Sequence, residues 1–263
     1  MKSIKPVFVA MLLGLALPAQ GDATKQVSAD FQKMVAEWQA AESTWRAAKN
    51  DVRDSEAYKE ARAAKDIAKM RAMTDAVTGP DRKAFGKRAL ALADQCEGDQ
   101  CLSVLTFAAT SFDDGGIAEV VIKRVLRDHV KREGIAELLN KSRSFVRLID
   151  AETTQNLLRK VNAENPHPLP RVHALLLMSK ATLKDREATA ADFASAKAQV
   201  LEADELAKGS RLARRTGRLR FEVENLLPGC EAPEISGEDL NGTSFKLSDY
   251  RGKVVLLDFW GFW

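Results

Sequence analysis

The chain has 263 residues, of which 45% are hydrophobic and 29% are charged, a balance that is typical of a soluble globular protein. Its 40 lysines and arginines exceed its 37 aspartates and glutamates only slightly, and the formal net charge is +3. A nucleic-acid-binding protein usually contains a clearly basic domain. The overall charge therefore predicts no nucleic-acid partner.

The first 21 residues have the pattern of an export signal. Lys2 and Lys5 form a short positive region, residues 7–17 form an apolar core, and Ala19 and Gly21 are the small residues at positions −3 and −1 of a cleavage site before Asp22. The apolar core is shorter than the about 20 residues that a membrane-spanning helix needs. The sequence thus predicts a cleaved signal peptide over 1–21 and an exported, soluble protein of the periplasm or cell envelope. An uncleaved anchor stays open as the alternative.

Residues 22–227 show helical periodicity almost throughout. Between residues 31 and 52 the apolar side chains recur every three or four positions, and Trp38 and Trp45 lie on this stripe. Such a pattern predicts an amphipathic helix that buries both tryptophans. A second, alanine-rich helix is predicted over 55–76, where a following Gly-Pro pair stops it.

Shorter helical segments alternate with polar turns in the remainder of this region. They are predicted over 82–96, 101–110, 117–130, 134–140, 144–150, 153–161, 171–183, 190–207 and 211–227. Thr189 followed by Asp192 is a capping-box variant, and Gly209 suits a helix C-terminal cap. The fold class predicted is mainly α: an all-helical domain over 22–227, built of helix pairs. Its rhythm resembles tetratricopeptide-type solenoids, without a clear repeat consensus.

Two of the three cysteines bracket a short polar turn. Cys96 and Cys101 enclose the letters EGDQ, and a local disulfide is predicted there if the Cα atoms come within about 7 Å. The alternative is two small apolar residues at helix ends. The C-x4-C spacing without a preceding strand is no redox motif, and no histidine lies nearby in the sequence to complete a metal site. Cys230 is either a free thiol or a small residue of a linker.

The histidines and one acidic turn carry no predicted function. His129, His167 and His173 are scattered and lie beside no cysteine or carboxylate pattern. Residues 113–116, DDGG, lack the spaced oxygen ligands of a calcium-binding loop and are predicted to be a turn. The sequence therefore predicts no cofactor and no metal site.

The pattern changes after residue 227. Asn241-Gly242 is a turn signal, residues 243–247 alternate with period two, and residues 254–260 form a continuous apolar run. An apolar run of this length predicts a strand that is buried on both faces of a sheet. Such a strand needs partner strands and covering helices.

This C-terminal stretch carries a series of motifs in a fixed order. They are Gly229, Ala232-Pro233, Asp239, Gly242, Leu247-Ser248-Asp249, Arg251-Gly252-Lys253 and Phe259-Trp260. In this order they resemble the opening of a TlpA/ResA-like thiol-disulfide oxidoreductase, a member of the redoxin (AhpC/TSA) group of thioredoxin-fold proteins. The resemblance implies a partial thioredoxin-like domain over 228–263.

The resemblance also implies roles for three residues near the end of the stretch. Trp263 stands where the family has the tryptophan that precedes its C-x-x-C motif. Asp258 aligns with the buried aspartate that is read as proton acceptor for the resolving cysteine, and Trp260 belongs to the same strand-end motif. A solvent-facing Asp258 is the alternative.

The resemblance finally implies an exported thiol-disulfide oxidoreductase whose partners are disulfide-bearing proteins or a membrane electron donor. The catalytic C-x-x-C is absent from these 263 residues, so we expect no dithiol exchange from them. A real stop, a gene fragment or an in-frame selenocysteine codon after Trp263 all fit this pattern. The alternative function is a non-catalytic helical scaffold, or partner-binding protein, with a vestigial redoxin segment.

Overall fold

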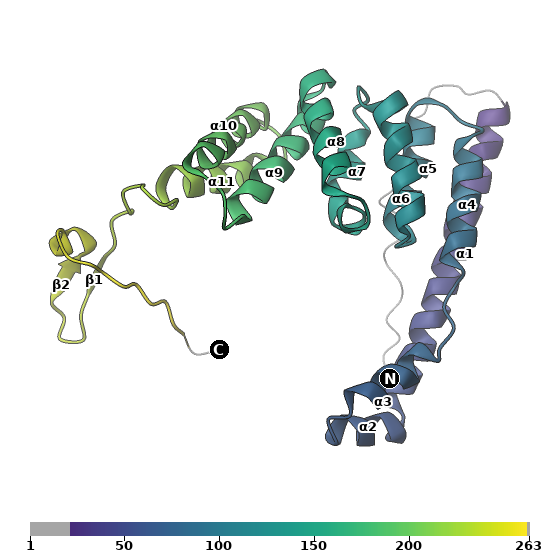
Figure 1. Ribbon diagram of the computed structural model, residues 1–263, viewed down its shortest axis with the longest axis horizontal. Helices are drawn as coiled ribbons and strands as arrows, with labels where there is room; N and C mark the ends of the chain where they lie inside the picture. Colours follow the sequence, from purple (N-terminus) through teal and green to yellow (C-terminus); the bar gives the residue numbers. More distant parts are fainter. Residues whose placement is uncertain (1–21, 262–263) are drawn as a thin grey trace. The chain divides into compact units, whose positions relative to one another are not determined.

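The computed structural model describes residues 22–261, which are mainly α-helical with one small two-stranded sheet near the end (Figure 1). The predicted signal peptide and Trp263 lie outside the described residues. Within the described part, no helix is both long and apolar enough to cross a membrane. The chain divides into two compact units, the first reaching Pro170 and the second beginning at Arg171. The predicted domain boundary at residue 228 stays a prediction.

The first unit consists of helices and short helical turns. They are α1 (Asp22–Asp54), α2 (Glu56–Ala63), α3 (Ile67–Asp75), α4 (Arg82–Ala93), α5 (Gly98–Ser111), α6 (Gly115–Arg124), the π-helical turn η1 (Val125–His129), α7 (Ile135–Asn140), the 3-10 turns η2 (Ser142–Ser144) and η3 (Val146–Leu148), and α8 (Ala151–Glu164). Helix α4 packs against α1 and α5, and α5 against α6 (Figure 1).

An aromatic cluster joins α1, α4 and α5. The ring of Trp38 meets Phe112 edge-on with centroids 4.9 Å apart, and meets Phe85 at 5.2 Å. Phe107 meets Phe112 edge-on from within the same part of the chain, at 5.2 Å. Edge-to-face pairs of this kind stabilise beyond their buried area. The predicted burial of Trp38 is thus confirmed, with 3% of its surface exposed, whereas Trp45 is only half-buried.

The prediction of one helix over 55–76 was wrong, because the helix breaks between α2 and α3. Lys65 adopts a left-handed conformation with φ of 54°. Asp66 then caps α3, its Oδ1 accepting a hydrogen bond from the Lys69 amide at 2.9 Å. Helix α3 contains no buried residue, so packing does little to keep the two segments in one straight helix. The local cap at Asp66 therefore determines that the helix breaks.

Two other helical predictions were only partly right. The segment 144–150 forms 3-10 turns rather than an α-helix, and the segment 117–130 widens from α6 into the π-helical turn η1. The turn predicted over 113–116 is only partly right: Asp113 and Asp114 lie between α5 and α6, whereas Gly115 and Gly116 begin α6. Asp114 caps that helix, its Oδ1 accepting a hydrogen bond from the Ile117 amide at 2.9 Å.

The second unit begins within α9 (Pro168–Lys184) and continues with α10 (Ala190–Leu206) and α11 (Ala213–Asn225). The predicted capping box at the start of α10 is confirmed: the Thr189 amide donates to Asp192 Oδ2 at 2.8 Å, and the Asp192 amide donates to Thr189 Oγ1 at 3.3 Å. The three helices share one apolar core. It contains Val172, Leu175, Leu176, Val200, Ala203, Ala207, Leu219 and Val223.

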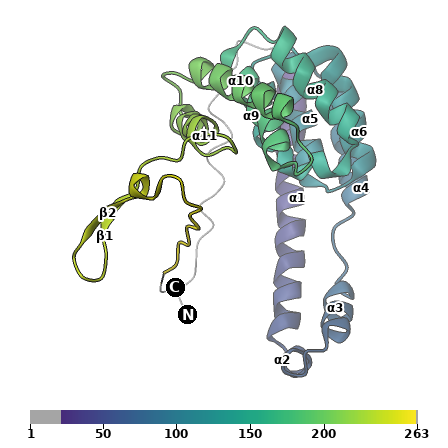
Figure 2. The ribbon, with the colours of Figure 1, turned by 60° about the vertical axis from the view of Figure 1, so that its left-hand side comes forward.

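The chain after α11 forms a small hairpin and then an irregular segment (Figure 2). Strands β1 (Ser236–Glu238) and β2 (Ser244–Lys246) pair antiparallel, with Gly237 opposite Phe245. The 3-10 turn η4 (Leu247–Tyr250) follows. The strand predicted over 254–260 does not form. A strand needs neighbours for its N–H and C=O groups, and the described residues bring none beside this run.

Candidate functional site

The loop of the β1–β2 hairpin is held by one carboxylate. Oδ1 of Asp239 accepts hydrogen bonds from the amides of Asn241 and Thr243, at 2.8 and 2.9 Å. These backbone hydrogen bonds lower the pKa of Asp239, because they favour its charged form. Gly242 follows with φ of 77°, a conformation that glycine adopts without strain. The D-x-x-G motif of the sequence is therefore a loop-building motif.

The next motif, from Leu247 to Lys253, builds a second turn. Asp249 Oδ2 accepts from the Lys246 amide at 2.8 Å, and Oε1 of Glu234 accepts from the Ser248 amide at 3.0 Å. Gly252 leaves the turn with φ of 80°. The motif residues thus fix the backbone path into the apolar run that follows them.

The apolar run carries the site residues that the sequence singles out. Asp258 lies on the exposed, irregular part of the chain, and Trp260 is 74% exposed. Trp263 lies outside the described residues. The structure does not bring Asp258 together with a cysteine, and the roles that the resemblance implies stay predictions.

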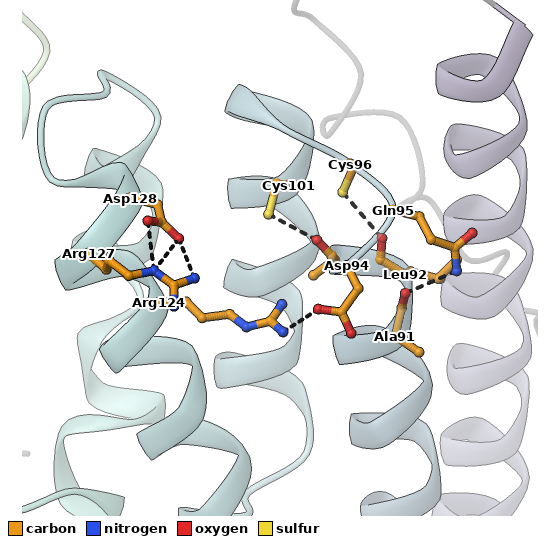
Figure 3. A network of polar contacts seen from close by, with 10 residues as sticks. Ala91, Leu92, Asp94, Gln95, Cys96, Cys101, Arg124, Arg127 and Asp128 are labelled. Carbon is orange, nitrogen blue, oxygen red and sulfur yellow. Dashed lines mark hydrogen bonds and ion pairs between the residues drawn. The ribbon is translucent and has the colours of Figure 1, made fainter.

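A second group of reactive side chains lies in the first unit, at the turn between α4 and α5. Cys96 Sγ donates a hydrogen bond to the carbonyl oxygen of Leu92, and Cys101 Sγ donates to that of Ala93, both at 3.4 Å (Figure 3). Leu92 and Ala93 are neighbours in the last turn of α4. The two sulfur atoms therefore gather at one helix end.

The turn that brings the two cysteines together depends on a glycine. Gly98 has φ of 65° and begins α5. The Cys101 amide donates to the carbonyl of Glu97 at 3.3 Å, which places Cys101 in the first turn of that helix. Both cysteines are free thiols in the structure. The predicted disulfide between them stays a prediction.

The two thiols are electrostatically unequal. The hydrogen bond from Cys96, together with the interactions of His129 and Arg124 and against the effect of burial, lowers the pKa of Cys101 to about 5. The hydrogen bond to Cys101 and burial raise the pKa of Cys96 well above its ordinary value. When the pair gives up a proton, Cys101 holds the negative charge and Cys96 keeps its hydrogen.

The charged groups around the pair come from α4, α6 and η1. Arg124, in the last turn of α6, forms an ion pair with Asp94, the C-cap residue that follows α4 (Figure 3). His129 is 5% exposed, and no hydrogen-bond partner for its Nδ1 atom is found among the described residues. Within residues 22–261, no three His, Cys, Asp or Glu side chains gather as a metal site.

The sequence did not point to His129, because it lies far from the cysteines along the chain. One signal was present: His129 continues the apolar stripe of Ile122 and Val125 at helical spacing, which predicts burial. Its place beside Cys101 depends on how α6 and η1 pack against α5, which periodicity does not give.

Comparisons with known proteins find short, partial matches to one kind of protein. The chain is 48% identical over 40 residues to the thiol-disulfide oxidoreductase ResA of Bacillus subtilis (strain 168), covering 15% of this chain and 22% of that protein. It is 54% identical over 35 residues to the ResA of Geobacillus kaustophilus (strain HTA426), covering 13% and 20%. The matched length is close to that of residues 229–263, which carry the resemblance. The chain spans about a fifth of the length of these curated relatives. No protein-family model matches the chain, and no solved structure does.

Proposed function

We propose that this protein is a thiol-disulfide oxidoreductase of the redoxin type, in which residues 228–263 belong to the opening part of a thioredoxin-like domain. The observation that carries the proposal is the 48% identity over 40 residues to ResA of Bacillus subtilis. Asp239, Asp249 and Gly252, three of the motif residues, build the turns of this segment. These residues therefore have a local structural role, which supports reading the motif as a folded segment.

The proposed chemistry is exchange between a protein dithiol and a disulfide. One thiolate attacks the substrate disulfide, and a second thiol resolves the mixed disulfide that forms. Asp258 would accept the proton of the resolving thiol, and Trp260 and Trp263 would flank the approach to the dithiol. The substrates would be disulfide-bearing proteins, and the electron donor a protein of the membrane.

The test is insulin disulfide reduction by the protein expressed from its whole reading frame, beside residues 22–263 alone. We expect the whole-frame protein to reduce insulin, and this activity to disappear when the cysteines of a C-x-x-C motif are replaced by serine. Residues 22–263 alone should reduce no more insulin than their three thiols account for. Asp258→Asn should slow turnover of the active protein, with Glu238→Gln on the exposed strand β1 as the matched control. A whole-frame protein without any reductase activity would contradict the proposal.

Export belongs to the same proposal. The charged, apolar and small-residue regions of 1–21 support a signal peptide that directs the protein to the periplasm or cell envelope. The test is the N-terminal sequence of the protein recovered from the envelope fraction. We expect it to begin near Asp22, whereas an intact Met1 would overturn the cleavage.

A helical scaffold is the second candidate function. The observation that favours it is the extent of the similarity, which leaves 85% of the chain without a match to ResA of Bacillus subtilis. The helices of each unit nevertheless bury well-defined cores. If the protein expressed from its whole reading frame has no reductase activity but still binds a disulfide-bearing partner, this result would favour the scaffold function over the oxidoreductase function.

A further inference from the structure

We propose that Cys96 and Cys101 form a second redox site, a reversible dithiol–disulfide pair that exchanges electrons with thiols and disulfides of low molecular mass. Cys96 is the sulfur that an outside thiolate attacks, and Cys101 is the sulfur that leaves. The site uses only residues of the first unit, so a test of it is independent of the function proposed for residues 228–263.

The two thiols lie close together at the end of α4. The two thiols donate to the successive carbonyls of Leu92 and Ala93, each at 3.4 Å. A thiol is a weak donor, so oxidation to a disulfide would give up only two weak hydrogen bonds. The left-handed conformation at Gly98 already turns the chain back on itself, and the pair closes across this turn.

The two cysteines differ in their exposure to solvent. Cys96 is half-buried in the turn, whereas only 6% of Cys101 is exposed. A thiolate from solution therefore reaches the sulfur of Cys96 and not that of Cys101. The rate of thiol–disulfide exchange depends on which sulfur is attacked and on which sulfur leaves. Here the fold determines that Cys96 is the sulfur that is attacked.

The surroundings of Cys101 suit a sulfur that leaves as a thiolate. Cys101 lies in the first turn of α5, where the helix dipole favours negative charge. The guanidinium of Arg124 adds positive charge on the side of α6, and the buried His129 of η1 lies beside the thiol and favours its charged form. A leaving thiol with a low pKa departs faster, and the pKa of Cys101 is lowered to about 5.

The exchange balances as follows. The outside thiolate forms a new S–S bond with Cys96 Sγ, the Cys96–Cys101 bond breaks, and its electron pair leaves on Cys101 as a thiolate. A second outside thiolate then attacks the outside sulfur of the mixed disulfide and releases Cys96, which takes up a proton. Two outside thiols are oxidised to one disulfide, and the protein disulfide is reduced to the dithiol. The reverse direction oxidises the pair at the expense of a small disulfide.

The first experiment traps the products on the whole chain carrying Cys230→Ser. The reduced protein is incubated with oxidised glutathione, quenched with an alkylating agent and measured by mass spectrometry. We expect a product lighter than the dithiol by two hydrogen atoms and free of glutathione. A glutathione adduct that persists on Cys96 would overturn the proposal. So would a dithiol that stays unchanged under conditions in which Cys230 of the chain without the substitution forms a glutathione adduct.

Serine variants separate the two sulfurs. Cys101→Ser should accumulate a stable glutathione adduct on Cys96, because no second thiol resolves it. Cys96→Ser should leave Cys101 largely unreacted, because it is buried. Equal adduct formation on both variants would contradict the assigned order, and circular dichroism checks that each variant is folded. If a variant fails to fold, the trapping experiment on the chain carrying only Cys230→Ser still tests whether the pair forms a disulfide.

His129 is proposed as a positioning residue that acts through the charge on Cys101. His129→Gln should slow reduction of the Cys96–Cys101 disulfide by glutathione about threefold or more, because the leaving thiolate loses support. The matched control is His173→Gln, a change at another buried histidine, in the second unit. An unchanged rate in His129→Gln, or an equal slowing in both variants, would remove this role.

Discussion

Asn165 joins the end of α8 to Val130, which immediately follows His129: its Nδ2 atom donates to the carbonyl oxygen of Val130 at 2.6 Å. The same amide donates to the carbonyl of Arg132 at 3.0 Å, and its Oδ1 accepts from the His167 amide at 2.9 Å. The side chain is 4% exposed. A single buried amide thus fixes the backbone that leads away from the π-helical turn.

Replacing this amide should destabilise the first unit. Asn165→Ala leaves the buried carbonyl of Val130 without its donor, which costs about 1–3 kcal/mol of unfolding free energy. The measurement is urea denaturation followed by circular dichroism, with Asn241→Ala, in the exposed hairpin loop, as control. Equal denaturation midpoints for the two variants would show that the side chain of Asn165 does not contribute this much to the free energy of unfolding.

The aromatic cluster offers a prediction on packing. Trp38→Ala should lower the unfolding free energy by about 3–5 kcal/mol, because it leaves a cavity between Phe85 and Phe112. Trp45→Ala is the matched control on the same helix. Trp45 is half-buried and its Nε1 donates to the Val77 carbonyl at 3.1 Å, so we expect a smaller loss. A larger loss at Trp45 would contradict the assignment of the core.

The thiol pair makes stability depend on pH in the reduced protein. The pKa of Cys101 falls from its ordinary value of 9.0 to about 5 on folding. Between these values the unfolded chain binds the proton that the folded chain has released, so the free energy of unfolding rises with pH. Above 9.0 the raised pKa of Cys96 acts in the opposite direction, because the folded chain keeps a proton that the unfolded chain loses.

The measurement is denaturation of the reduced protein at a series of pH values. Asp94, Arg124 and His129 surround the pair and stay unchanged in the comparison. Cys101→Ser should remove the rise between about pH 5 and 9, whereas Cys230→Ser should keep it. Indistinguishable pH profiles for the two variants would refute a folded-state thiolate at Cys101.

The apolar run near the C-terminus should exchange its amide hydrogens rapidly in this chain. Val254 and Leu256 are fully exposed, at 103% and 93%. The amides of β1 and β2 that pair in the hairpin should be slower, and those of the core helix α5 slowest, since protection follows local stability. Hydrogen exchange read by mass spectrometry tests this order. Protection across 254–259 equal to that of α5 would contradict it.

Much of the fold could be predicted from local sequence signals. The period of the apolar residues indicated α1 and the burial of Trp38, and Thr189 with Asp192 indicated the start of α10. The break at Lys65 could not be found this way, because an alanine-rich sequence favours a continuous helix and only a local cap at Asp66 opposes it.

The candidate sites were less predictable. The motifs of the C-terminal stretch identify a resemblance, and the structure adds that Asp239 and Asp249 make the turns. The spacing of Cys96 and Cys101 indicated proximity. The partner His129 depends on packing between α5, α6 and η1, and such long-range contacts leave no periodic signal along the chain.

The short turn between α4 and α5 has a consequence for how a bond between Cys96 and Cys101 would act. In the chain-entropy description, a disulfide stabilises by restricting the unfolded chain, and the gain grows with the loop it closes. A ring this small restricts little, about 2 kcal/mol against about 4.7 kcal/mol for a loop of a hundred residues. The disulfide would therefore add little to the stability of the fold. The packed helices stabilise the fold both with the disulfide and with the dithiol. A bond that the fold can gain or give up at little cost is suited to turnover rather than to reinforcement.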